Sequence, residues 1–207
     1  QVSNPKNITN HPGYDNQPSF HAQQPLVYYA SFNDEGRSDI KIFNYETGQT
    51  SALTRTQERE YSPTLTPDKK YISCIIQSAN NANLIVGYHA WMDDSRLLLF
   101  VLGDPMTLRV YDTSTGQDQI LAERIGRSLH KIPGERAMSL VSKSDEEWVI
   151  MRLDNRSLSM TPIINTLKGR EDLTWTPDGK ILMSDGERIF VFNPKLKSKA
   201  WAQVPML

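Results

Sequence analysis

The 207-residue chain has the composition of an ordinary globular protein, with 38% hydrophobic and 23% charged residues. Its formal net charge of −1, without a long run of either sign, argues against broad contact with nucleic acid or anionic lipid. The longest apolar run, "RLLLFVLG", is far shorter than the roughly 20 residues of a transmembrane helix. The single cysteine, Cys74, excludes an intrachain disulfide, and the opening "QVSNPKNITN" has none of the features of a signal peptide.

One pattern recurs along the chain: a large apolar residue, a tight turn and then an apolar strand. Five copies place such a residue just before the turn: Phe20, Leu65, Trp91, Ile132 and Trp175. The separations are 45, 26, 41 and 43 residues, and three of these fit the roughly 40–50 expected for four-stranded propeller blades. We therefore predict an all-β fold, a β-propeller of four-stranded antiparallel blades with five repeats in a ring of five or six.

The predicted elements follow one another in a single domain, residues 1–207. Residues 1–9 are expected to form a strand that closes the ring by completing the last blade, which would remove an exposed edge. The blade repeats are expected at 14–55, 58–85, 86–123, 127–166 and 170–207.

Local turn chemistry supports this order. In "TPDGK" the proline presets φ and the glycine accepts a positive φ, so the chain reverses there. Further downstream, "ETGQ" and "STGQ" supply a glycine turn into the outermost strand. No 12-residue window has a sustained helical period.

The second repeat is short. Only ten residues, "SANNANLIVG", lie between "YISCIIQ" and "YHAW", which leaves no room for a third strand and its turn. Either this blade is truncated, or a segment around Ser78–Asn83 is missing from the chain. We favour the missing segment, because the loss of one strand would expose the edge of its neighbour.

The blade signature resembles that of a known family. "DNQPSF", "EYSPTLTPDKK" and "LTWTPDGK" resemble the WD40-like repeats of the TolB family of propellers, and the resemblance extends over nearly the whole chain. It implies a ring of usually six blades, a periplasmic or secreted bacterial protein, and a protein partner. With five repeats present, a sixth blade would be missing, degenerate or cut off after "VPML".

Polar and aromatic residues on the predicted inner strands are the candidate binding residues. His89 and His130 each stand two positions before the pre-turn apolar residue of their repeat, so both are expected near the central channel. They would line the channel or, alternatively, form a metal pair or a proton shuttle. Tyrosines at or just before inner strands would stack on a peptide or a sugar at the channel rim. The predicted channel or rim positions are Tyr14, Asp15, Tyr61, Tyr88, His89 and His130.

The sequence contains no motif of a known reaction. It lacks G-x-S-x-G, a glycine-rich phosphate loop and the EF-hand spacing, so no catalytic residue, metal or cofactor is expected. Our first hypothesis is a non-enzymatic propeller that binds a protein or peptide. The alternatives are a small-ligand or carbohydrate-handling propeller enzyme, either a hydrolase or a lyase, and the propeller cap of a larger peptidase.

Overall fold

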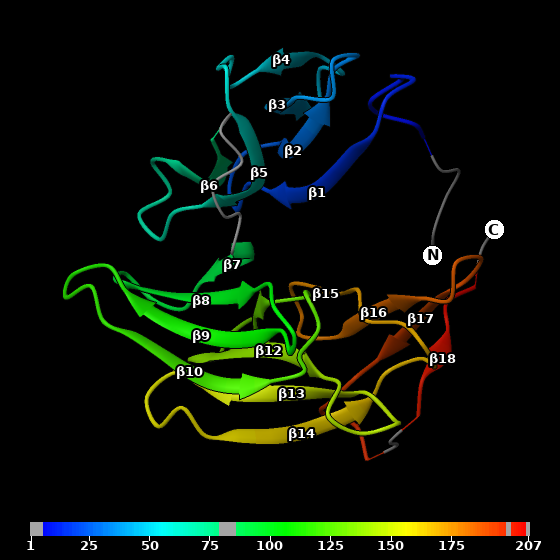
Figure 1. Cartoon of the computed structure of the whole chain (residues 1–207). Coiled ribbons are helices and arrows are strands. Elements are labelled where there is room, and N and C mark those ends of the chain that lie inside the picture. Colours follow the sequence, from blue (N-terminus) through cyan, green and yellow to red (C-terminus); the bar gives the residue numbers. More distant parts are fainter. Residues whose placement is uncertain (1–5, 79–85, 198–199, 206–207) are drawn as a thin grey trace.

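The computed structural model describes residues 6–78, 86–197 and 200–205, and these residues form strands, turns and loops without any helix. Their 18 strands make four four-stranded antiparallel sheets and one two-stranded sheet, each built from consecutive strands (Figure 1). This confirms the predicted β-propeller of four-stranded antiparallel blades with a short second blade. No helix in the described ranges could cross a membrane.

The five sheets are called blades 1 to 5 in chain order. Blade 1 contains β1 (Asp15–Phe20), β2 (Leu26–Phe32), β3 (Ser38–Asn44) and β4 (Thr50–Ala52). Blade 2 contains β5 (Arg59–Leu65) and β6 (Ile72–Gln77). Blade 3 contains β7 (Val86–Trp91), β8 (Arg96–Val101), β9 (Thr107–Asp112) and β10 (Asp118–Glu123). Blade 4 contains β11 (His130–Lys131), β12 (Ala137–Ser142), β13 (Val149–Asp154) and β14 (Met160–Asn165). Blade 5 contains β15 (Leu173–Trp175), β16 (Ile181–Ser184), β17 (Ile189–Phe192) and β18 (Ala202–Gln203).

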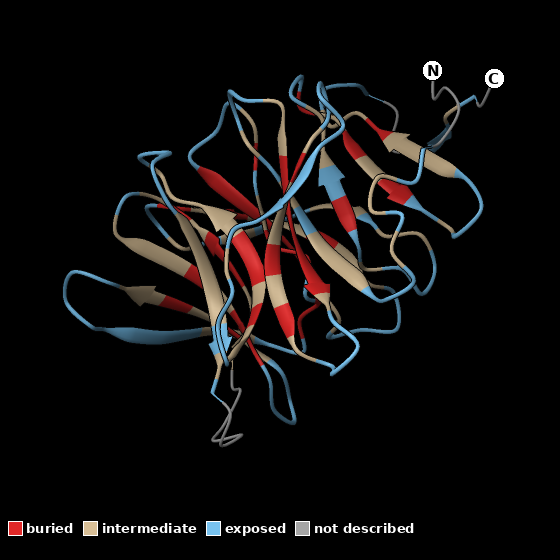
Figure 2. Cartoon of the chain, turned by 90° about the horizontal axis from the view of Figure 1, so that it is seen from above, coloured by how far each residue is buried: buried red, intermediate tan, exposed pale blue. Residues whose placement is uncertain are grey.

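Within every blade the strands lie in chain order, and the first strand is innermost. The first strands β1, β5, β7 and β11 contact one another in succession. Burial is extensive on the second strands of blades 1 and 4: five residues in a row are buried in both β2 and β12, whereas all three residues of β4 are exposed. Figure 2 shows this change from buried inner strands to exposed turns and outer strands.

The turns between first and second strands use the predicted chemistry. In blade 5 the Thr176 N–H and the Lys180 carbonyl close the turn at 2.8 Å, and Gly179 has a φ of 83°. In blade 2 Lys69 occupies the equivalent position with a φ of 61°, so a side chain stands in the left-handed region that glycine prefers.

The residues that close these turns show how the repeats align. The closing pairs Met92–Arg96 and Thr176–Lys180 enclose three residues, whereas Ile132–Ala137 encloses four. Ile132 therefore stands in the turn-closing position, one residue beyond the position of Trp91 and Trp175. As a result, His89 and His130 do not occupy equivalent places in their blades.

The apolar core is shared between neighbouring blades. One cluster joins blade 3, through residues such as Leu98 and Leu108, to Met138 and Leu140 of blade 4. A second cluster joins Val141 and Ile150 of blade 4 to three apolar side chains of strands β16 and β17: Ile181, Met183 and Phe192. Blades 1 and 2 share only a smaller cluster, with Ile40 on one side and partly buried Ile72 on the other.

The structure describes only part of two segments for which the sequence makes predictions. These are the expected closing strand at residues 1–9 and the expected gap around Ser78–Asn83. Residues 6–9 of the expected closing strand form no strand, and Ile8 instead packs on Val27, Tyr29 and Phe43 of blade 1. Residues 1–5 lie outside the described residues, so ring closure by this segment stays a prediction. The expected gap around Ser78–Asn83 falls mostly on residues 79–85, which also lie outside them.

Candidate functional site

The loops of the blades open on two opposite faces. The loops that lead into each first strand and those that join second to third strands lie on one face, because the strands of each blade alternate in direction. We call this the leading face. The turns between first and second strands, and between third and fourth strands, lie on the opposite face, which we call the trailing face.

A cleft of about 310 Å³ opens on the leading face between blades 4 and 5. It is formed by the loops that precede β11 and β15 and by the loop between β16 and β17. The cleft is lined by Arg127, Gly169, Arg170, Glu171, Asp172, Ser184 and Gly186.

Ion pairs fix most of the charged groups of this cleft. Arg127 donates two hydrogen bonds to the Asp172 carboxylate, from Nε at 3.0 Å and from Nη2 at 2.7 Å. These bonds raise the pKa of the Arg127 guanidinium above its usual range. The Glu171 carboxylate accepts from Lys143 Nζ at 3.0 Å and from the Arg127 backbone N–H at 3.0 Å. Both carboxylates are thus paired with cations that join blade 4 to blade 5.

Two of the predicted rim tyrosines meet at the leading face between blades 1 and 2. The rings of Tyr14 and Tyr61 lie 5.4 Å and 5.9 Å from the ring of Phe32, measured between centroids. Tyr14 is 61% exposed, and its hydroxyl accepts a hydrogen bond from Asn16 Nδ2 at 2.7 Å. We call Tyr14, Phe32 and Tyr61 the aromatic cluster.

Asp15 lies at the start of β1, directly beside this cluster in the chain. Its Oδ2 is 3.6 Å from His11 Nδ1, and its Oδ1 is buried without a hydrogen-bond partner among the described residues. Asp15 is paired with Ser31 of β2, so both side chains project from the same face of blade 1.

Tyr88 lies away from the aromatic cluster. Its ring packs edge-on against Phe100 at 5.9 Å between centroids, and it borders the core shared by blades 3 and 4. It is close enough to Arg127 to contribute to the raised pKa of that guanidinium. Tyr88 thus lies near Arg127 but is not among the residues that line the cleft.

His89 is buried against the preceding blade. Its Nε2 lies 2.8 Å from Ser73 Oγ of β6. Ser73 Oγ also accepts from Trp91 Nε1 at 2.9 Å and lies 3.1 Å from the Thr64 carbonyl oxygen. Burial lowers the pKa of His89 to about 4.

His130 faces the following blade instead. Its Nε2 lies 3.0 Å from Ser128 Oγ, and the same hydroxyl accepts the backbone N–H of Leu173 at 3.1 Å. Burial lowers the pKa of His130 to about 4 as well. His89 thus bonds to blade 2 and His130 to the loop that leads into its own strand, and no three metal-ligating side chains gather anywhere in the described ranges.

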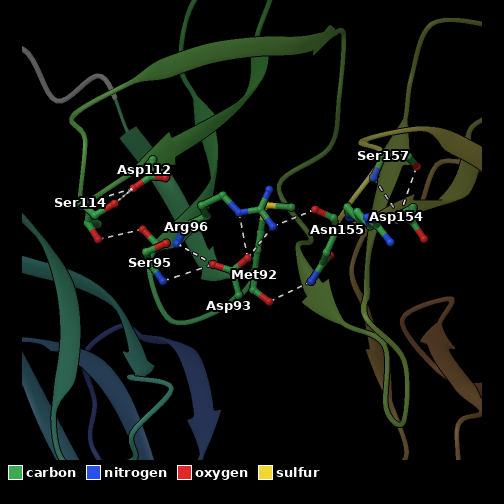
Figure 3. Close-up of polar contacts among 11 residues, drawn as sticks. Met92, Asp93, Ser95, Arg96, Asp112, Ser114, Asp154, Asn155 and Ser157 are labelled. Carbon is green, nitrogen blue, oxygen red and sulfur yellow. Dashed lines mark hydrogen bonds and ion pairs between the residues drawn. The ribbon is translucent and has the colours of Figure 1, made fainter.

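A second polar network lies on the trailing face between blades 3 and 4 (Figure 3). Arg96 donates from Nε to Asp93 Oδ2 at 2.8 Å and from Nη2 to the Asn155 carbonyl at 2.8 Å. Asn155 is buried and donates from Nδ2 to the Met92 carbonyl at 2.9 Å. These contacts tie two turns together, and we assign the network to blade cohesion.

Comparison with solved structures identifies the fold. TolB from Acinetobacter baumannii matches 97% of this chain with a TM-score of 0.53 at 15% identity. The fold is that of a TolB-like β-propeller. The chain spans 45% of that TolB chain, so less than half of its length. No protein-family model matches the chain, and no curated protein does.

Other proteins share this TolB-like fold. An oligogalacturonate lyase from Vibrio parahaemolyticus matches 95% of the chain and 80% of its own, with 12% identity and a TM-score of 0.52. A putative gluconolactonase matches 91% of the chain and 77% of its own, with 11% identity and a TM-score of 0.63. At such low identity these likenesses show the fold alone.

Sequence reasoning missed the residues of the cleft. The run "GRED", residues 169–172, places three charged residues in the loop that leads into an inner strand, and this was the signal available in the sequence. What the sequence does not reveal is that Arg127, in the corresponding loop of the preceding blade, lies opposite that run.

Proposed function

We propose that the protein is a non-enzymatic binding scaffold for a protein or peptide, and that the partner docks on the leading face. The observation that carries the proposal is the pair of recognition features on this face, the aromatic cluster and the charged cleft. Tyrosine and arginine are enriched among the residues that dominate binding energy at interfaces. Phe32 and Tyr61 lie on strands β2 and β5, and most of the cleft residues lie on loops between packed strands. Such a scaffold lowers the entropic cost of binding.

The predicted rim residues enter this proposal in different ways. Tyr14 and Tyr61 offer aromatic surface to the partner. The Asp15 side chain is only 12% exposed and faces His11, so it is assigned to the support of the start of β1. Tyr88 lies near Arg127, one of the residues that line the cleft. His89 is assigned to the contact between blades 2 and 3, because its Nε2 bonds to Ser73. His130 is assigned to the support of Ser128, which in turn accepts the Leu173 N–H of blade 5.

The alternative functions suggested by the sequence stay predictions. A carbohydrate-handling hydrolase or lyase, and the cap of a larger peptidase, both agree with a propeller fold, which hosts many unrelated activities. Our proposal includes export to the bacterial periplasm, which rests on the resemblance to the TolB family. A nucleic-acid partner forms no part of it, since the net charge is −1.

The test is selection from a displayed library of random 12-residue peptides on the immobilised protein. We expect enriched peptides to bind Tyr14→Ala and Tyr61→Ala variants at least tenfold more weakly, as is usual for interface hot spots. The matched control is Tyr71→Ala, since Tyr71 is 68% exposed and belongs to the turn between β5 and β6 on the trailing face. Absence of any enriched peptide, or equal losses in the Tyr71 variant, would contradict the proposal.

A further inference from the structure

The charged cleft between blades 4 and 5 contains one guanidinium that no carboxylate neutralises. Within the described part of the chain, Arg170 forms no ion pair, whereas Arg127 and Lys143 are paired with Asp172 and Glu171. Arg170 Nη2 donates to the carbonyl of Asp185, and the Asp185 carboxylate is already bound by Arg188 at 3.0 Å.

The resulting charge of the cleft fits a singly charged anion. Arg127 and Arg170 line the cleft together with Glu171 and Asp172, and Lys143 pairs with Glu171 from outside the lining. These five groups together carry one positive charge. A carboxylate would neutralise that charge. A phosphate dianion would add a second negative charge close to two existing carboxylates, which is unfavourable.

Two glycines have no side chain to collide with the charged groups of the cleft. A Cβ on Gly186 would lie 3.2 Å from Arg170 Nη2, and the φ of 109° at this residue is one that other residues rarely adopt. A Cβ on Gly126 would lie 2.6 Å from Glu171 Oε2. The backbone at both positions therefore fits the charged groups that line the cleft.

We propose that this cleft binds a carboxylate of the peptide partner, either an acidic side chain or the C-terminal carboxylate, through the fork of Arg170. This inference rests on the proposed function and names the chemistry that the leading face recognises. A guanidinium presents parallel N–H donors that match the two oxygens of a carboxylate. Ser184 accepts the Gly186 N–H at 2.9 Å, so its hydroxyl proton is available as a further donor.

The experiment uses three short probes and nuclear magnetic resonance of the full chain. The probes are acetyl-Gly-Asp-Gly-amide, acetyl-Gly-Gly-Gly with a free C-terminus, and the neutral acetyl-Gly-Gly-Gly-amide. We expect saturable shifts of the Gly186 amide and the Arg170 Nε–H with at least one carboxylate probe and none with the neutral probe. Comparison of the first two probes distinguishes a side-chain carboxylate from a terminal one.

Two variants make the test specific. Arg170→Gln should weaken binding of the carboxylate probe at least tenfold. Arg156→Gln should leave it unchanged, because Arg156 is an exposed arginine in a trailing-face turn. Equal shifts with the neutral probe, tighter binding of inorganic phosphate at the same amides, or unchanged binding to Arg170→Gln would overturn the inference.

The result of the probe experiment can be told apart from the result of the peptide selection that tests the proposed function. If selected peptides bind through Tyr14 and Tyr61 but no probe shifts Gly186, the binding scaffold stands and the carboxylate site is wrong. If the probes bind but no peptide is enriched, the cleft recognises carboxylates and the proposed function is wrong.

Discussion

At the scale of single residues, buried histidines determine how the fold responds to pH. Burial lowers the pKa of His89 to about 4 from an ordinary value of 6.5. The folded protein therefore binds fewer protons than the unfolded chain between these two pH values. Stability is complete above pH 6.5 and falls as the pH decreases toward 4.

We expect His89 alone to reduce the free energy of unfolding by about 2 kcal/mol when the pH is lowered from 7.5 to 5. His130 adds a loss in the same direction, because its pKa is also lowered to about 4. Urea unfolding at the two pH values measures the effect. In His89→Gln, which keeps a donor for Ser73, the loss should be roughly halved. The same pH dependence in variant and parent would show that His89 is not responsible.

The sequence predicted the chemistry of the turns better than their length. "TPDGK" and "TPDKK" predict chain reversals from the turn preferences of proline, aspartate and glycine, and the structure has a turn at both places. Ile132 is itself the turn-closing residue of blade 4, whereas Trp91 and Trp175 each precede theirs, so aligning these three residues places blade 4 one residue out of register. Since a shift of one residue moves side chains to the opposite face of a strand, the expected equivalence of His89 and His130 does not hold.

At the scale of elements, a tryptophan–serine hydrogen bond recurs between blades. Trp91 donates to Ser73 of blade 2 at 2.9 Å, and Trp175 donates to Ser139 of blade 4 at 2.8 Å. In both cases the serine hydroxyl also lies within reach of a carbonyl of its own first strand. The repeat therefore preserves a contact between blades as well as the fold of each blade.

A double-mutant cycle tests this contact at Trp175 and Ser139. We expect Ser139→Ala to reduce the free energy of unfolding by about 1–2 kcal/mol, because the indole N–H loses its partner. In the background of Trp175→Phe, which has no such donor, the same serine change should cost about 1 kcal/mol less. Strict additivity in chemical denaturation would mean that the hydrogen bond contributes nothing.

The cleft shows why contacts between elements escape sequence reasoning. Arg127 and Asp172 are separated by 45 positions, and each belongs to a loop that looks like an ordinary solvated turn. Only the packing of blade 4 against blade 5 brings the two loops together. The aromatic cluster was easier to anticipate, since Tyr14 and Tyr61 precede or begin inner strands in the sequence itself.

At the scale of the whole molecule, stability is expected to be uneven. Blades 3, 4 and 5 are joined by two extensive core clusters, whereas blades 1 and 2 share a small one. Blade 2 also contributes only two strands from the described residues. Regions with few buried apolar contacts open at lower free energy than the rest of a fold.

Native-state hydrogen exchange should resolve this difference. We expect the amides of β5 and β6 to exchange through openings at least 2 kcal/mol less costly than those of β12 and β13, given that local openings range from near zero up to the global stability. Equal protection in both pairs of strands would indicate that the chain unfolds as one unit.

The central claim is that the molecule recognises its partner through the leading face of a TolB-like propeller. Hydrogen exchange with and without a selected peptide tests it most directly, because each loop reports on its own face. We predict that protection increases in residues 124–129, 166–172 and the residues around Tyr14, while the trailing-face turns 113–117 and 155–159 exchange as before. Protection confined to those trailing-face turns would contradict the account.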